Sequence, residues 1–311
     1  MTLDSIFNDE WSDDHRSGGI AVVGRPNVGK STLINAIIGQ KVAIATPKPQ
    51  TTRRNQLGIY TEESGQILFT DTPGLHKPRN ALGDYMMTVA SQALEDADVI
   101  VWILDVSEAP HKSDNYIATT IQEKAKDTPV ILVLNKIDLV LKKDNFSAYT
   151  SLIDHTAAYR VSAAKGDGIS DLTQALIALM PQGPRYYPVD QVSDLTMRFM
   201  VAEVIREKVI LNTEHEIPHA VAVEVTDYKD KETRTDIYAV IYVERNSQKG
   251  IVIGKSGSMI KKIGIEARQE IEPMVERQVF LDLRVKVLKN WRSNETFMRR
   301  VGYRMPKNDV D

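Results

Sequence analysis

Short apolar runs alternate with longer amphipathic segments along the first half of this chain. The runs at 20–23, 66–69, 99–104 and 130–134 are suited to buried strands. Apolar residues recur at helical spacing in 31–38, and 80–97 and 168–179 are also suited to helices. Strands that alternate with helices predict a doubly wound, mostly parallel α/β sheet. Ligand-binding loops of such a sheet gather at the carboxyl ends of its strands.

The pattern changes after residue 180. Three prolines lie in 181–188, where they prevent a helix and favour an extended connector. Beyond them, 195–211 has helical spacing, whereas 220–225, 236–243 and 279–288 read as strands. We therefore expect a flexible N-terminal extension at 1–18, an α/β domain at 19–180, a connector at 181–188 and an α+β domain at 189–311.

Length and composition fit two globular domains. The chain has 311 residues, of which 42% are hydrophobic and 26% charged, and single cores usually stop growing at about 250 residues. No apolar run approaches the roughly 20 residues that span a bilayer, and the acidic first 18 residues do not resemble a signal peptide. The absence of cysteine excludes disulfides and thiolate zinc sites. These features fit a cytoplasmic protein.

A glycine-containing loop between a predicted strand and a predicted helix indicates a phosphate-binding site. Gly24 and Gly29 let successive backbone N–H groups point at a phosphate, and Lys30 supplies positive charge. The Ser31 hydroxyl is suited to ligate Mg²⁺. The loop and its helix start comprise Gly24, Arg25, Pro26, Asn27, Val28, Gly29, Lys30, Ser31 and Thr32.

A second motif follows the run at 66–69. We expect Asp71 to hold Mg²⁺ through a water molecule, and the Gly74 N–H to bond the γ-phosphate only while that group is present. The residues of this motif near the phosphates are Asp71, Thr72, Pro73, Gly74 and Leu75. The polar segment 48–54, which contains Thr51 and Thr52, is suited to close over the metal in the triphosphate state.

Two further motifs predict that the base is guanine. Asp138, just after the run at 130–134, can accept from both guanine N1–H and N2–H₂, whereas adenine offers neither donor. Lys136 can lie over the base, and Asn135 can tie this loop to the phosphate loop. In the fourth motif, Ser162-Ala163, the Ala163 N–H is suited to bond guanine O6.

The second domain contains a turn of the form GXXG inside a basic stretch. Residues 245–262 hold five Lys or Arg and no acid, and 284–307 hold eight against one Glu. Unmixed positive charge favours a polyanion partner, although both stretches also suit ordinary solvated surfaces. The GXXG turn within an α-β-β-turn-helix-strand order has the form of a KH motif, which binds single-stranded nucleic acid. The expected RNA-binding residues are Gly250, Ile251, Val252, Ile253, Gly254, Lys255, Ser256, Gly257, Lys261 and Lys262.

With these motifs in this order, residues 19–305 resemble the Era family of bacterial GTPases. The resemblance implies a P-loop GTPase domain followed by a type II KH domain, with GTP or GDP and Mg²⁺ as cofactors. It implies a molecular switch that binds the 3′ region of 16S ribosomal RNA and assists 30S subunit assembly. It also implies peripheral contact with the inner membrane. We further expect a monomer with no DNA partner.

The family pattern also bears on hydrolysis. It favours Thr52 over Thr51 as the metal ligand, alongside Ser31 and Asp71. Leu75 stands where many GTPases carry a water-orienting glutamine, so unaided hydrolysis should be slow. Asn27 is a candidate ligand for K⁺, which would supply additional charge. The expected catalytic residues are therefore Lys30, Thr52, Gly74 and Asn27.

Two other functions remain open from the residues. One is a P-loop kinase or ATPase whose second domain binds a small substrate, and nucleotide preference distinguishes it. The other is a peripheral membrane or translation-factor GTPase whose basic C-terminal segment meets lipid head groups or protein. Trp291, Phe297 and Tyr303 in that segment suit either base stacking or a core.

Overall fold

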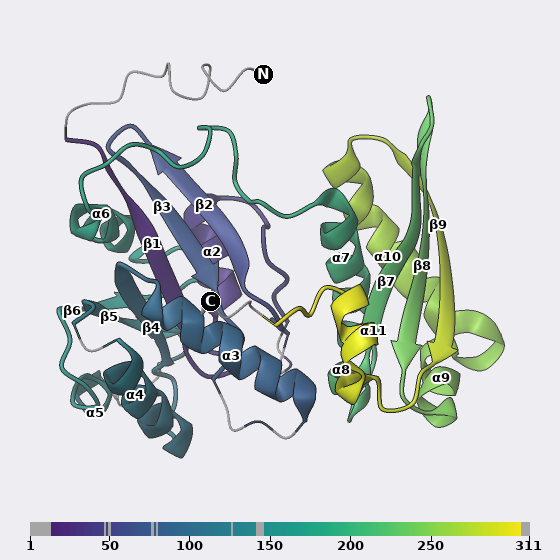
Figure 1. The fold of residues 1–311 in the computed structure, drawn as a ribbon, viewed down its shortest axis with the longest axis horizontal. Coiled ribbons are helices and arrows are strands. Elements are labelled where there is room, and N and C mark those ends of the chain that lie inside the picture. The colour runs from purple at the N-terminus through teal and green to yellow at the C-terminus, as the bar shows by residue number, and fades with distance from the viewer. Residues whose placement is uncertain are drawn as a thin grey trace, which may run out of the picture. The chain divides into compact units, whose positions relative to one another are not determined.

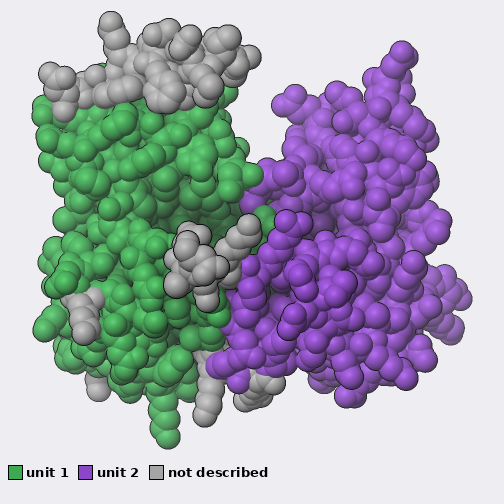
Figure 2. Space-filling view, viewed as in Figure 1, with its two compact units in different colours: residues 1–45, 52–77, 86–194 green, residues 46–51, 78–85, 195–311 purple. Residues whose placement is uncertain are grey.

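The computed structural model describes residues 14–46, 48, 51–75, 78, 80–125, 127–140 and 146–305. It divides into two compact units (Figures 1 and 2). Unit 1 contains residues 1–45, 52–77 and 86–194, and unit 2 contains 46–51, 78–85 and 195–311. Two short segments from the first half of the chain therefore belong to the second unit.

Unit 1 is built on a six-stranded sheet with strand order β2-β3-β1-β4-β5-β6. All neighbouring strands are parallel except the antiparallel pair β2 and β3. This arrangement confirms the predicted α/β class. The strands are β1 Arg16–Val23, β2 Gln56–Glu62, β3 Gly65–Asp71, β4 Val99–Asp105, β5 Val130–Asn135 and β6 Ala157–Val161.

Helices cover both faces of this sheet. The central strands carry apolar side chains on both faces, and both faces must therefore be covered. In β4, Val101 and Ile103 belong to one core cluster, while Trp102 and Leu104 belong to the other. Every residue of β4 is buried. The helices are α2 Lys30–Ile38, α3 Ala81–Glu95, α4 Lys112–Lys124, α5 Phe146–Thr150 and α6 Ile169–Leu179. Residues 81–85 of α3 belong to unit 2.

Two strands of unit 1 were not predicted from the sequence. Strand β2 lies at one edge of the sheet beside β3, and β6 lies at the opposite edge. Edge strands are half-exposed, so β6 has mixed polar and apolar residues and no continuous apolar run. The first strand begins at Arg16, inside the expected extension 1–18, and residues 1–13 of that extension lie outside the described part of the chain.

The proline-containing connector lies along unit 1 and joins it through an isolated antiparallel bridge between Gln182 and Arg16. The Ser17 N–H donates to the Pro181 carbonyl at 2.9 Å, and the Arg16 guanidinium donates to the Met180 carbonyl at 2.7 Å. The Gln66 side chain accepts from the N–H groups of Tyr186 and Tyr187. The boundary between the units in this stretch lies at 194/195, and the expected domain limits stay predictions.

Unit 2 has a three-stranded sheet in the order β7-β8-β9, with β7 antiparallel and β9 parallel to β8. Its longer helices α7, α9 and α10 pack through one apolar cluster with the inward-facing residues of the sheet. The elements are α7 Met197–Asn212, α8 Ile217–Ala220, β7 Ala222–Asp230, β8 Arg234–Val243, α9 Asn246–Ile253, α10 Ser258–Val275, β9 Gln278–Val287 and α11 Glu295–Arg300.

The aromatic residues of the basic C-terminal segment belong to the core. Trp291, Phe297 and Tyr303 are at most 7% exposed, and the Phe297 ring packs edge-on against Tyr242 of β8, with centroids 4.7 Å apart. These three rings are therefore not available for base stacking. In the described part of the chain, no helix is long and apolar enough to cross a membrane.

Candidate functional site

The phosphate loop joins the end of β1 to the start of α2, and its backbone requires glycine at two positions. Gly24 has a φ of 153° and Gly29 a φ of 105°. A Cβ at Gly24 would lie 2.5 Å from the Ile103 carbonyl oxygen, and one at Gly29 would lie 2.4 Å from Asn135 Nδ2. Because these contacts are far too short, the loop conformation depends on both glycines.

Lys30 is buried at the base of this loop. Its Nζ donates to the carbonyl oxygens of Gly24 at 3.1 Å and Arg25 at 3.0 Å. Burial lowers the pKa of Lys30 to about 8, although the nearby Asp71 carboxylate opposes that effect. A bound anion raises the pKa of such a lysine, because phosphate oxygens favour its charged form.

The lowered pKa of Lys30 predicts that nucleotide affinity falls as pH rises. The ligand-free protein loses this proton above pH 8, whereas the phosphate-bound form keeps it, so binding takes up a proton. We expect the GDP dissociation constant to be about fourfold higher at pH 8.5 than at pH 7.0. Calorimetry at pH 8 in two buffers of different ionisation enthalpy should show uptake of about half a proton. No proton uptake would contradict the assigned pKa.

Three side chains whose oxygen atoms can bind a metal ion meet beside Lys30. Ser31 Oγ donates to Asp71 Oδ2 at 2.7 Å, and Thr52 Oγ1 lies 3.1 Å from the same carboxylate oxygen and 3.2 Å from Ser31 Oγ. Thr51 is directed elsewhere, since its Oγ1 bonds Thr46 and the Lys48 carbonyl. The arrangement supports Thr52, rather than Thr51, as the threonine that belongs to this cluster.

This cluster fits Mg²⁺. Asp71 is 1% exposed, and its Oδ1 has no hydrogen-bond partner among the described residues. Burial raises the pKa of Asp71, and the positive charge of Lys30 lowers it. A buried carboxylate oxygen beside two hydroxyls is a donor set that Mg²⁺ prefers. In the described ranges, no group of three or more His, Cys, Asp or Glu offers an alternative metal site.

Three residues predicted near the phosphates have side chains that contact other parts of unit 1. The Arg25 side chain donates to Asp114 at 2.9 Å and Glu108 at 2.8 Å, so it holds the loop to the start of α4. The Thr72 hydroxyl donates to the Val22 carbonyl at 2.7 Å. Leu75 is fully buried in the apolar core. Packing thus directs these three side chains elsewhere, and the place of these residues near the phosphates stays a prediction.

Asn135 joins the first, third and fourth motifs. Its Nδ2 donates to the Val28 carbonyl at 2.7 Å, and its Oδ1 accepts from the Ala163 N–H at 3.0 Å. The tie between Asn135 and the phosphate loop was predicted from the sequence. The hydrogen bond from the Ala163 N–H to Asn135 was not predicted. A guanine O6 that bonds this N–H would have to share it with the Asn135 Oδ1.

The base-selecting carboxylate is positioned by the fourth motif. Asp138 is exposed in a short 3₁₀ turn, Ile137–Leu139, that follows β5. Its Oδ1 accepts from Ser162 Oγ at 2.6 Å. Lys136 has a φ of 68°, and its Nζ pairs with Asp105 Oδ2 at 2.5 Å. Ser162 and Asp105 thus fix the orientation of the two side chains expected to contact the base.

The GXXG turn of unit 2 lies between α9 and α10. Gly254 has φ 73° and ψ 171°, a conformation essentially limited to glycine. Lys255 and Ser256 are exposed on the turn, and Lys261 and Lys262 are exposed on α10. Val252 is fully buried in the core, so its predicted contact with RNA is wrong. Helical periodicity in α9 directs Val252 inward and leaves Ile251 51% exposed.

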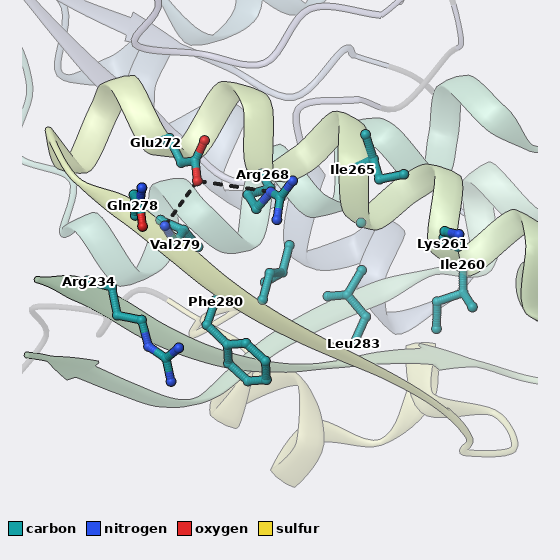
Figure 3. A pocket seen from close by; sticks show the side chains of 12 residues that line it. Arg234, Ile260, Lys261, Ile265, Arg268, Glu272, Gln278, Val279, Phe280 and Leu283 are labelled. Carbon is teal, nitrogen blue, oxygen red and sulfur yellow. Dashed lines mark hydrogen bonds and ion pairs between the residues drawn. The ribbon is translucent and has the colours of Figure 1, made fainter.

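A groove of about 760 Å³ runs between α10 and β9 (Figure 3). Lys261 was the one predicted RNA-binding residue in its lining. The other lining residues were not predicted from the sequence, because the groove forms only when α10 packs beside β9. The lining residues are Arg234, Ile260, Lys261, Gly264, Ile265, Arg268, Glu272, Gln278, Val279, Phe280, Leu281 and Leu283.

Comparison with known proteins gives consistent matches for both units. A family model described as a 50S ribosome-binding GTPase matches residues 19–136, and a KH domain model matches residues 216–292. A crystal structure of an Era variant from Aquifex aeolicus bound to GDP·AlF₄⁻ shares 38% identity, with a TM-score of 0.86. The match covers 93% of this chain and 99% of that one.

A second solved structure is similar over the same extent. It is Era in complex with MgGDPNP and nucleotides 1506–1542 of 16S ribosomal RNA. The identity is 36%, the TM-score 0.86, and the match covers 93% of this chain and 99% of that chain.

Proposed function

Because this chain belongs to the Era family of GTPases, we propose that it is a GTP-hydrolysing molecular switch that binds the 3′ region of 16S ribosomal RNA. The observation that carries the nucleotide part is the junction at Asn135, which brings together the phosphate loop and both base-selecting motifs. The groove beside the GXXG turn supports the RNA part. In this proposal, the protein assists assembly of the 30S ribosomal subunit.

The finer parts of the proposal rest on the family. We place the protein in the cytoplasm as a monomer, with peripheral contact at the inner membrane and no DNA partner. Asn27 as a ligand of K⁺ stays a prediction.

The nucleotide site supports hydrolysis by positioning and charge. Lys30 would contact the β- and γ-phosphates, and the Gly74 N–H would bond the γ-phosphate. Ser31, Thr52 and Asp71 would hold Mg²⁺, which supplies charge neutralisation for the phosphates when bound. Leu75 provides no proton acceptor, so hydrolysis without a further factor is slow.

The RNA part is tested at Gly257. This residue has a φ of 79°, which Asp and Asn tolerate better than other side chains. A Cβ there would have nothing within 4 Å, and both residues are good N-caps for α10. We expect Gly257→Asp to weaken binding of an RNA spanning nucleotides 1506–1542 at least about thirtyfold, because a carboxylate would repel phosphates at the turn.

Gly257→Asn is the matched control, because it adds the same volume without the charge. We expect it to bind this RNA within about threefold of the wild-type protein at one fixed salt concentration. Fluorescence anisotropy measures both affinities, and thermal unfolding checks that the variants fold. Equal RNA affinity of the Asp and Asn variants would contradict RNA binding at the turn.

A further inference from the structure

An exposed aromatic ring lies at one end of the groove in unit 2. Phe280 of β9 is 43% exposed and lines the groove together with Arg234 of β8. Figure 3 shows both near the end marked by Glu272 and Gln278, whereas Ile260 and Lys261 mark the other end. The GXXG turn directly precedes α10 and therefore lies at the Lys261 end.

The strand register explains how the groove reaches this ring. Val279 and Leu281 belong to or pack against the core under α10, so the alternation of a strand directs Phe280 to the opposite face of the sheet. In the three-stranded sheet that the structure describes, β9 is the edge strand beside β8. A chain that leaves the groove over this open edge would meet Phe280 without crossing another strand.

Phe280 is held in place by its neighbours. Its ring meets Tyr238 edge-on, with centroids 5.9 Å apart and an interplanar angle of 62°. The Arg234 guanidinium carbon lies 5.3 Å from the Phe280 centroid, and Arg234 Nε pairs with Asp236 at 2.7 Å. A single exposed aromatic residue is common on protein surfaces. Here the ring is fixed in orientation, carries a cation beside it and lines a groove.

We propose that Phe280 is a stacking platform for an unpaired RNA base, with Arg234 contacting the adjoining phosphate. This subsite rests on the proposed RNA-binding function and extends it to the end of the groove opposite the GXXG turn. From Ile260 to Glu272, α10 extends over roughly 18 Å, so the subsite receives a different nucleotide from those at the turn. RNA is the occupant because the ring is continuous with the groove and base stacking tolerates any sequence.

The first measurement is the affinity for RNA spanning nucleotides 1506–1542 at fixed salt. We expect Phe280→Ala to bind about tenfold more weakly, within the range for loss of one base–aromatic stack. Phe280→Tyr keeps the ring and should bind within about twofold of the wild-type protein. Tyr116→Ala is the matched control, because it removes a ring of 42% exposure from α4 in unit 1.

A second measurement separates stacking from a general loss of structure. Single abasic substitutions are placed along the RNA, and each RNA is tested with wild-type and Phe280→Ala protein. We expect one position at which removing the base weakens wild-type binding about tenfold but does not weaken binding by the variant further. A structural defect would instead give additive losses at every position.

The outcomes distinguish this proposal from the function on which it depends. Unchanged RNA affinity of Phe280→Ala, or additive losses at all positions, contradicts the subsite. If Gly257→Asp loses RNA affinity while Phe280→Ala keeps the wild-type affinity, the subsite alone is wrong. If the wild-type protein fails to bind the RNA, the proposed function is wrong, and the subsite with it.

Discussion

Replacing Asp138 with asparagine should weaken GTP binding at least about a thousandfold. The wild-type carboxylate offers acceptors to guanine N1–H and N2–H₂, and Ser162 holds it in place at 2.6 Å. An amide offers one acceptor and places its NH₂ against a guanine donor. Sites that hydrogen-bond a particular group reject mismatched ligands by about 10⁴ or more. Xanthosine triphosphate has a carbonyl at C2, so Asp138→Asn should bind it in preference to GTP.

Competition binding with labelled GDP measures this effect. The wild-type protein should reject ATP. The variant should gain affinity for xanthosine nucleotides and lose affinity for guanosine nucleotides. Asp171→Asn is a suitable control, since it neutralises an exposed carboxylate in the first turn of α6. If ATP competes equally with GTP in the wild-type protein, the guanine assignment is wrong and the kinase or ATPase alternative gains support.

Replacing Gly29 with alanine should reduce the affinity for both GDP and GTP more than about a hundredfold. The φ of 105° is strained for any residue with a Cβ, at a cost of about 1–3 kcal/mol. The added Cβ would also lie 2.4 Å from Asn135 Nδ2. Asn135 is fixed by Val28 and Ala163, so relief of this clash disturbs the phosphate loop and the base site together.

The opposite end of the same helix provides the control. Gly39 caps α2 with a φ of 80°, and a Cβ there would have nothing within 4 Å. Gly39→Ala should lose about 1–2 kcal/mol of stability through the left-handed conformation alone and keep its nucleotide affinity. Thermal unfolding and calorimetric titration of both variants separate strain from loss of the site. Equal nucleotide affinity of Gly29→Ala and wild type would contradict the phosphate-loop assignment.

Local sequence was sufficient to identify the motifs and most of the elements. The apolar run of β4 predicts a buried strand, and the glycines of the phosphate loop indicate their function because a tight backbone turn requires them. Edge strands β2 and β6 were not predicted, because their burial depends on the neighbours that the fold provides.

What the sequence by itself determined was which chemistry this chain carries: a phosphate loop, a guanine-selecting carboxylate and a GXXG turn. Periodicity and backbone preference act over a few residues and can be recognised without the fold. Tertiary structure alone decided the direction of side chains whose partners are distant in the chain. It turns Arg25 toward Asp114, buries Val252, and places Phe280 beside Arg234 at the end of a groove. These contacts depend on strand register and helix packing, which bring together residues as far apart in the sequence as Arg25 and Asp114, 89 positions.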